Sequence, residues 1–344
     1  MKFPIPLLLL GLTTQESLAL PNQPRVKELF SYPPTNPIFL EAIYPLPDGR
    51  FLVSHFTSST IPGPTPVLVF DPRLPNPTPQ EVLILPNISG QTGIAPLGQN
   101  RYAITTGHLE GIAYQFGTVN THIISLPPFA KKATLLDSIP APAGSILMNG
   151  LAPLPGRKHI ILSADSGTGS ILRINTLTRM TDTLIQHPRL GPGNNTVLPI
   201  GINGLRVKDD YVYFTQTAQG FFGRIKINPL TGDIKPNAKI ETVSLIGGGE
   251  VGFENAFDDF TFEKSENNAY ITRHSQFLVK VNLATGKQEV IVGPGNIDKD
   301  SDNGVRLKGP TAVTLGLSGK ELFVTTSGQV DGVRIGGQVV SVQL

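Results

Sequence analysis

Short apolar stretches alternate with turns rich in glycine, proline and asparagine along the chain, and this pattern repeats six times. Each repeat begins at a polar or Gly/Pro-flanked position and continues into an apolar strand, a tight turn and a second strand. The aligned starts are Glu41, Thr92, Asn149, Asn203, Asp258 and Pro310. Their spacings are 51, 57, 54, 55 and 52 residues, and no stretch shows the periodicity of a long amphipathic helix.

The repeat that starts at Asp258 shows the complete unit. Its apolar runs predict strands at 260–262, 269–273, 277–282 and 288–292. The third strands of three successive repeats end at equivalent asparagines, 53 and 54 residues apart: Asn175, Asn228 and Asn282. An all-strand repeat of this length is typical of a propeller blade, so the sequence predicts an all-β, six-bladed β-propeller.

The last repeat is too short for four strands. After its first two strands only residues 338–344 remain, which is enough for a third. Residues 26–32, before the first repeat, have strand character. Because an open ring would leave an unpaired edge, we expect this N-terminal strand to join the last blade and close the ring.

Composition and charge limit the classes of function. The 344 residues are 39% hydrophobic and carry a formal net charge of +2, too little to indicate a nucleic-acid or anionic-membrane partner. The absence of cysteine removes thiol nucleophiles and thiolate metal sites. We find no nucleophile elbow and no dinucleotide or phosphate-binding fingerprint, so no organic cofactor is predicted. Oligomeric state is not predicted.

The N-terminus predicts a cleaved secretory signal. Lys2 precedes an apolar run at 5–12 that is too short to span a bilayer. Ser17 and Ala19 then place small residues before a cut after Ala19. Residues 1–19 would be the signal peptide and residues 20–344 a single propeller domain; the alternative is a disordered apolar N-terminus.

Two glycosylation sequons agree with secretion. They begin at Asn87 and Asn194 and fall in turns between predicted strands. We therefore expect a glycoprotein of the secretory pathway or extracellular space, with no membrane attachment after signal cleavage.

The repeat starts of a propeller converge on its axis, and four of these six carry side-chain oxygen donors: Glu41, Asn149, Asn203 and Asp258. The second strands end on the same face, which would bring His55, His108 and His274 to the mouth of the central pocket. The alternatives are that Asn and Asp only cap turns and that the histidines are ordinary hydrogen-bonding partners.

These features resemble the senescence marker protein/gluconolactonase family of six-bladed propellers. The resemblance covers most of residues 26–344 and rests on Glu41, on Asn-Gly-Leu at 149–151 and 203–205, on Ala-Asp-Ser-Gly at 164–167 and on Asp258. In that family one Glu, two Asn and one Asp hold a divalent cation at the top of the channel. The chain departs from the family at Ala42-Ile43, where Gly-Pro is usual.

The resemblance implies that Glu41, Asn149, Asn203 and Asp258 are metal ligands. Calcium is the expected cation because hard cations take carboxylate and amide oxygens, whereas zinc would attract His or Cys. The adjacent Asp259 is an alternative to Asp258.

Aromatic residues near the predicted mouth would make the pocket more apolar than a sugar-lactone site needs. They are Tyr114, Phe116, Phe221, Phe222 and Phe257. Packing between blades is the alternative for each.

Three functions remain open. The first is a metal-assisted lactonase or esterase, in which Asp258 or a mouth histidine moves the proton. The second follows from resemblance to a secreted fungal branch of these propellers, which includes hetero-Diels–Alder cyclases of tropolone–sesquiterpenoid biosynthesis. The third is a non-catalytic propeller that binds a ligand.

The cyclase is the first choice on the strength of this resemblance: the signal peptide, the sequons and the proline-rich segments look like those of the fungal branch. The resemblance implies an enzyme of secondary metabolism, and the apolar mouth fits a small hydrophobic substrate. Such an enzyme would join a quinone-methide-type diene to a terpene alkene by orienting both and excluding water. Its candidate polar anchors are Asn149, Asn203 and the mouth histidines. Across the open functions, the candidate catalytic residues are Asn149, Asn203, Asp258, His108 and His274.

An acidic stretch at 298–304 has the alternating carboxylates of a calcium loop. It lacks an acidic residue at the twelfth position, Gly309, and has no flanking helices. We predict a solvated loop there.

Overall fold

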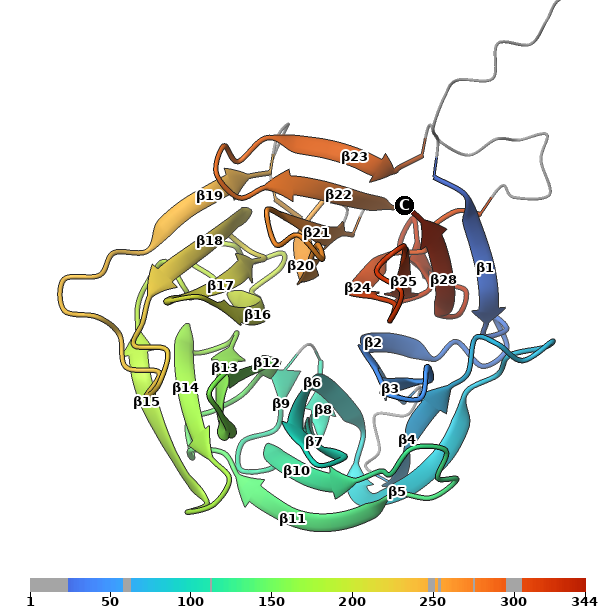
Figure 1. Cartoon of the computed structure of the whole chain (residues 1–344), viewed down its shortest axis with the longest axis horizontal. Helices are drawn as coiled ribbons and strands as arrows, with labels where there is room; N and C mark the ends of the chain where they lie inside the picture. Colours follow the sequence, from blue (N-terminus) through green and yellow to red (C-terminus); the bar gives the residue numbers. More distant parts are fainter. Residues whose placement is uncertain are drawn as a thin grey trace, which may run out of the picture.

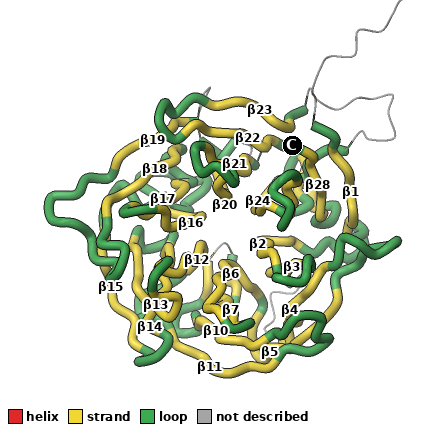
Figure 2. The backbone as a smooth tube through the Cα atoms, viewed as in Figure 1, coloured by secondary structure: helices red, strands yellow, loops and turns green. Residues whose placement is uncertain are grey.

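The computed structural model describes residues 24–57, 63–111, 113–246, 251–252, 255–274, 276–294 and 305–344. Figure 2 shows this part of the chain as strands and loops around a central axis. Within it, no helix is long and apolar enough to cross a membrane.

The described strands form four four-stranded sheets and one eight-stranded sheet that contains two four-stranded units. Each four-stranded unit is called a blade below, and this arrangement is consistent with the predicted six repeats. Blade 1 contains β2 (Phe39–Pro45), β3 (Phe51–Phe56), β4 (Gly63–Phe70) and β5 (Gln80–Ile88). Blade 2 contains β6 (Gly90–Gly98), β7 (Arg101–Gly107), β10 (Asn120–Ser125) and β11 (Thr134–Pro140). Blade 3 contains β12 (Met148–Leu154), β13 (Arg157–Asp165), β14 (Ser170–Asn175) and β15 (Met180–Gln186).

The other three blades follow the same order. Blade 4 contains β16 (Ile202–Lys208), β17 (Tyr211–Gln216), β18 (Phe221–Lys226) and β19 (Glu241–Leu245). Blade 5 contains β20 (Phe257–Phe262), β21 (Asn268–Arg273), β22 (Phe277–Asn282) and β23 (Gln288–Val292). Blade 6 contains β24 (Pro310–Leu315), β25 (Glu321–Thr326), β28 (Gln338–Gln343) and β1 (Val26–Ser31).

Two short hairpins complete the described strands: β8 (Leu109–Glu110) with β9 (Ala113–Tyr114), and β26 (Gln329–Val330) with β27 (Val333–Arg334). Figure 1 shows the inner strands β2, β6, β12, β16, β20 and β24 nearest the axis. A bridge between Phe56 and Gly90 joins blades 1 and 2 into one continuous sheet.

The predicted closure of the ring is confirmed. β1 pairs antiparallel with β28, from Val26 opposite Val342 to Ser31 opposite Gln338. In Figure 1 the blue β1 lies beside the red β28. The two ends of the described chain therefore share one blade.

Each gap between neighbouring blades holds an apolar core, because the strands alternate residues that face the two adjoining blades. The described buried residues form six such clusters. For example, Leu205 and Phe214 of blade 4 pack with Leu154 and Leu162 of blade 3.

Near the axis, buried hydroxyl groups of the described residues link five of the six pairs of neighbouring blades, from blade 2 round to blade 1. Their donors and carbonyl acceptors are Thr92 to Met148 (2.7 Å), Ser166 to Ile202 (2.5 Å), Thr217 to Phe257 (2.8 Å), Thr272 to Thr311 (2.8 Å) and Thr311 to Leu40 (2.8 Å). These bonds hold the inner strands at fixed distances around the channel.

Candidate functional site

A register shift in every inner strand positions the site residues. It falls between Leu40 and Ile43 in β2, and at the equivalent place in the other five inner strands. A bulge leaves residues unpaired and redirects their side chains. Glu41, Asn149, Asn203 and Asp258 lie within these shifts.

The blade 6 equivalent is Thr311, because the shift there lies between Pro310 and Ala312. The predicted start at Pro310 was therefore displaced by one residue. The hydroxyl of Thr311 is used in a hydrogen bond to the carbonyl of Leu40.

Glycines after two of the site residues let neighbouring inner strands approach closely. A Cβ on Gly150 would lie 2.5 Å from the carbonyl oxygen of Asn203 and 2.6 Å from the backbone nitrogen of Leu205. A Cβ on Gly204 would likewise meet the backbone and side chain of Asp259. The Asn-Gly pairs thus place each asparagine at the axis and keep the next blade in contact.

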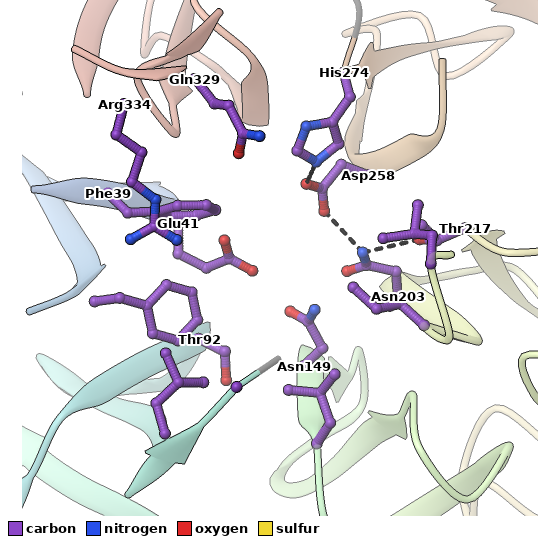
Figure 3. A pocket seen from close by; sticks show the side chains of 16 residues that line it. Phe39, Glu41, Thr92, Asn149, Asn203, Thr217, Asp258, His274, Gln329 and Arg334 are labelled. Atoms are coloured by element: carbon purple, nitrogen blue, oxygen red, sulfur yellow. Dashed lines mark hydrogen bonds and ion pairs between the residues drawn. The ribbon is translucent and has the colours of Figure 1, made fainter. Parts of the chain in front are cut away.

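Four side chains from four blades form the polar floor of the central pocket (Figure 3). The exposed fractions of Glu41, Asn149, Asn203 and Asp258 are 8%, 9%, 4% and 5%. Figure 3 shows Glu41 on one side of the opening, Asp258 and Asn203 on the opposite side, and Asn149 between them. The structure therefore brings all four predicted metal ligands together.

Hydrogen bonds fix the Asp258 side of this floor. The Nδ2 of Asn203 donates to Oδ1 of Asp258 at 2.8 Å and to Oγ1 of Thr217 at 3.0 Å. His274 places its Nε2 2.9 Å from Oδ2 of Asp258. Asp258 is thus held between an amide and an imidazole.

Burial dominates the electrostatics of the two carboxyl groups. Removal from water raises the pKa of Glu41 well above its ordinary value; the charges of Asp258 and Asp259 add to this rise, and a hydrogen bond from Asn149 opposes it. Burial also raises the pKa of Asp258, against the lowering effect of His274. Because two ionised carboxyl groups repel one another in a buried pocket, such a pair favours either keeping a proton on one of them or binding a cation between them.

The donor set fits a hard divalent cation. Two carboxylates supply a charge of −2, and two amides add neutral oxygen ligands of the kind calcium accepts. Across the described residues, no cluster of three or more His, Cys, Asp or Glu side chains is arranged to hold a metal ion. A cation bound here would therefore depend on the two asparagines as well as the two carboxylates, a ligand set unlike that of a zinc site.

Above the floor the pocket is apolar, with a volume of about 200 Å³. Its apolar wall consists of Phe39, Phe56, Leu109, Leu147, Leu198 and Ile200. The rings of Phe39 and Phe56 meet edge to face, with centroids 5.1 Å apart. Gln329 and Arg334 of the β26–β27 hairpin also line the pocket.

The predicted apolar mouth exists, but other residues make it. Phe221, Phe222 and Phe257 are buried in the cores between blades, Tyr114 is buried as well, and Phe116 is exposed. None of the five lines the central pocket in the described part of the chain. Sequence reasoning missed Phe39 because it precedes the repeat start, and Arg334 because its hairpin lies outside the repeat.

Only one of the three predicted mouth histidines lines the pocket, and it is His274. His108 lies outside because its Nε2 contacts the carbonyl oxygen of Asn87. His55 is buried, with its Nε2 2.8 Å from the carbonyl oxygen of Pro66. Register brought the three backbones to one face, but side-chain direction separated them.

Asp258 and Asp259, the two alternatives for the fourth ligand, occupy different positions. Asp258 lines the main pocket. Asp259 forms an ion pair with Arg206 at 2.8 Å, and both line a smaller cavity beside the floor. Asp259 therefore acts on the floor through its charge.

Both sequon asparagines are exposed. Asn194 lies in the loop between β15 and β16, as predicted, whereas Asn87 lies within strand β5 and not in a turn. The predicted signal peptide at 1–19 and the acidic stretch at 298–304 lie outside the described residues.

No protein-family model matches the chain, and no curated protein matches its sequence significantly. Solved structures do match. A luciferin-regenerating enzyme superposes with a TM-score of 0.61 at 13% identity, over 93% of this chain and 95% of its own. Regucalcin of Agrobacterium tumefaciens C58, described as a calcium-binding protein, gives 0.55 at 13% identity, over 92% and 94%.

The PQQ-bound aldose sugar dehydrogenase of Streptomyces coelicolor is a further match, with a TM-score of 0.54 at 15% identity over 94% of this chain and 100% of its own. Identities this low bear on the fold alone. The resemblance to the fungal cyclase branch stays a prediction. The chain shares the all-β propeller fold of these proteins, and its activity has to be argued from its own pocket.

Proposed function

We propose that the protein is a divalent-cation-dependent hydrolase of a lactone or ester that carries an apolar group. The observation that carries this proposal is the pair of buried carboxyl groups, Glu41 and Asp258, which face one pocket together with two amides. A cycloaddition requires that the two reacting groups be oriented and that water be excluded, but it does not require two ionisable carboxyl groups. Burying two carboxyls is costly unless they are used, which favours hydrolysis over cyclisation.

Glu41, Asn149, Asn203 and Asp258 would hold the cation. When bound, it would polarise the substrate carbonyl and lower the pKa of a water molecule. Calcium suits this all-oxygen set, and the calcium-binding regucalcin among the structural matches supports the choice.

Asp258 is the group that we assign to proton transfer. Its carboxylate lines the pocket, so it can accept the proton of a water molecule that lies there. A water molecule attacks the carbonyl carbon and gives its proton to Asp258. The acyl C–O bond breaks, and the proton passes to the departing oxygen, which leaves a carboxylic acid and a hydroxyl group. His274, 2.9 Å from Asp258, orients the carboxylate.

The test is hydrolysis of alkyl-substituted lactones and aryl esters in the presence of calcium. Asp258→Asn and Glu41→Gln should each lower kcat/KM by about 100-fold or more. The exposed carboxylates Asp209 and Glu266 provide matched controls as Asp209→Asn and Glu266→Gln. Absence of hydrolysis by the native protein, or rates unchanged in both pocket variants, would contradict the proposal.

The hetero-Diels–Alder cyclase is the second candidate, and the apolar wall above the floor favours it. That wall could hold a quinone-methide-type diene against a terpene alkene, with Asn149 and Asn203 as polar anchors. Leu198→Phe, which partly fills the pocket, should then change the stereochemical ratio of products while Asp258→Asn retains cyclisation. If neither reaction occurs, the pocket belongs to a ligand-binding propeller.

We also propose that the protein follows the secretory pathway and is glycosylated. The exposure of Asn87 and Asn194 supports modification at both sequons. Glycosidase treatment of the secreted protein should increase its gel mobility, and Asn87→Gln with Asn194→Gln should remove that shift.

A further inference from the structure

A short hairpin presents Arg334 to the pocket in a defined way. Gln329 and Arg334 are cross-strand partners in the β26–β27 hairpin, so their side chains lie on the same face. Asp331 and Gly332 between the strands have φ values of 50° and 79°. A two-residue turn with both φ angles positive matches the twist of the flanking strands and gives a tight hairpin.

Arg334 rests against the aromatic wall of the pocket. Its Cζ lies 5.7 Å from the centroid of the Phe39 ring, a separation at which the ring face attracts a cation. Figure 3 shows Arg334 and Phe39 on the same side of the opening as Glu41. The guanidinium is therefore oriented by the wall on which an apolar substrate would lie.

No carboxylate of the described residues forms an ion pair with Arg334. The acidic residue of its own hairpin, Asp331, pairs instead with Arg306 at 3.8 Å. Arg334 is also the sole lysine or arginine among the described residues that line the central pocket. Its charge is thus available to a ligand.

The charge balance of the pocket points to the sign of that ligand. Glu41 and Asp258 contribute −2, which a divalent cation would cancel. Arg334 would then leave the pocket with a net charge of +1. A guanidinium with free donors prefers a carboxylate, which it can bind through two parallel hydrogen bonds.

We propose that Arg334 binds a carboxylate group of the substrate and so selects an apolar acid. The lactone or ester in this substrate rests on the proposed function. With it, the substrate is an apolar carboxylic acid that also carries a lactone or ester group. The carboxylate lies at the rim beside Phe39, the apolar part lies along the wall, and the reacting carbonyl lies over the floor.

Calorimetric binding of two probes of equal length, octanoate and 1-octanol, tests this without any turnover. The native protein with excess calcium should bind octanoate at least about tenfold more tightly than 1-octanol. Arg334→Gln should remove that preference and leave 1-octanol unchanged. Arg334→Lys should retain part of it, because the charge remains but the paired hydrogen bonds are lost. The exposed Arg157, as Arg157→Gln, is the matched control.

Octanoate could instead bind to the cation, and the variants separate the two modes. Equal octanoate affinity in Arg334→Gln and the native protein would overturn the inference, as would a native protein without preference between the probes. Because binding is measured without turnover, an Arg334-dependent preference with no ester cleavage would refute the hydrolase and keep the carboxylate site. Cleavage of neutral esters by a protein without such a preference would refute the carboxylate site and keep the hydrolase.

Discussion

Glu41 and Asp258 determine what the pocket can do at the scale of single residues. Both are buried, and each has a pKa raised above its ordinary value, chiefly by burial. A carboxyl whose pKa is higher in the folded state binds its proton more tightly there. Its contribution to stability is complete below its unfolded pKa and is lost as pH rises through the folded pKa.

Glu41→Gln should therefore stabilise the cation-free protein. Glutamine keeps the size of the side chain and removes one of two buried like charges. In chelator at about pH 8, we expect the free energy of unfolding to rise by about 1 kcal/mol, and to fall less steeply with pH than in the native protein. Urea titrations from about pH 5 to about pH 8 measure this. A variant no more stable than the Glu266→Gln control would show that these carboxyls do not repel one another.

Sequence reasoning found these residues through the period of the repeat. The period locates strand starts to within a residue, which sufficed for Glu41, Asn149 and Asn203 and left Asp258 and Asp259 as alternatives. Only three-dimensional contact decides between the latter, because Arg206, the ion-pair partner of Asp259, lies 53 residues away along the chain. The direction of a side chain could not be predicted from the period either. For this reason His108 was expected at the pocket mouth, whereas the structure places it outside the pocket.

At the scale of elements, the bulged start of each inner strand is the device that builds the floor. In the sequence, the Asn-Gly pairs that begin at Asn149 and Asn203 mark two of these bulged starts. Only the structure shows why glycine is needed there: Gly150 lies against the backbone of the next blade. Arg334 sits on a hairpin between the second and third strands of blade 6. Among the described strands, blade 2 alone has a counterpart, β8–β9, so periodicity could not assign Arg334 a role.

Gly150→Ala should damage both stability and the site. A Cβ 2.5 Å from the Asn203 carbonyl oxygen forces the two inner strands apart. We expect a loss of about 1–3 kcal/mol in the free energy of unfolding, together with weaker cation binding. Gly144→Ala is the control, because a Cβ there would meet no heavy atom within 4 Å. Equal stability of the two variants would contradict the close-approach argument.

At the scale of the whole molecule, closure by β1 keeps six blades in one ring. β1 covers an otherwise open edge of β28, whose Val340 and Val342 are fully buried. The closure was predictable because the repeat count left the last blade one strand short. The hydroxyl hydrogen bonds that link blades near the axis could not be predicted from the period. Their donors do not occupy one repeated position of the blade, since some lie in inner strands and others lie in or after second strands.

A chain that begins at Tyr32 should be strongly destabilised compared with one that begins at Pro24. The shorter chain loses β1 and exposes the edge of β28, so we expect a decrease of about 3 kcal/mol or more in the free energy of unfolding. Urea unfolding of both chains measures the difference. Identical midpoints would show that the ring does not depend on this strand.

The proposed hydrolase requires that the floor of the pocket bind one divalent cation. Calorimetric titration of the cation-free protein with calcium measures this binding, with Glu41→Gln and the Glu266→Gln control alongside. We expect about one calcium ion per chain, with affinity reduced at least about tenfold in Glu41→Gln and unchanged in the control. No binding, or equal binding in all three proteins, would contradict it.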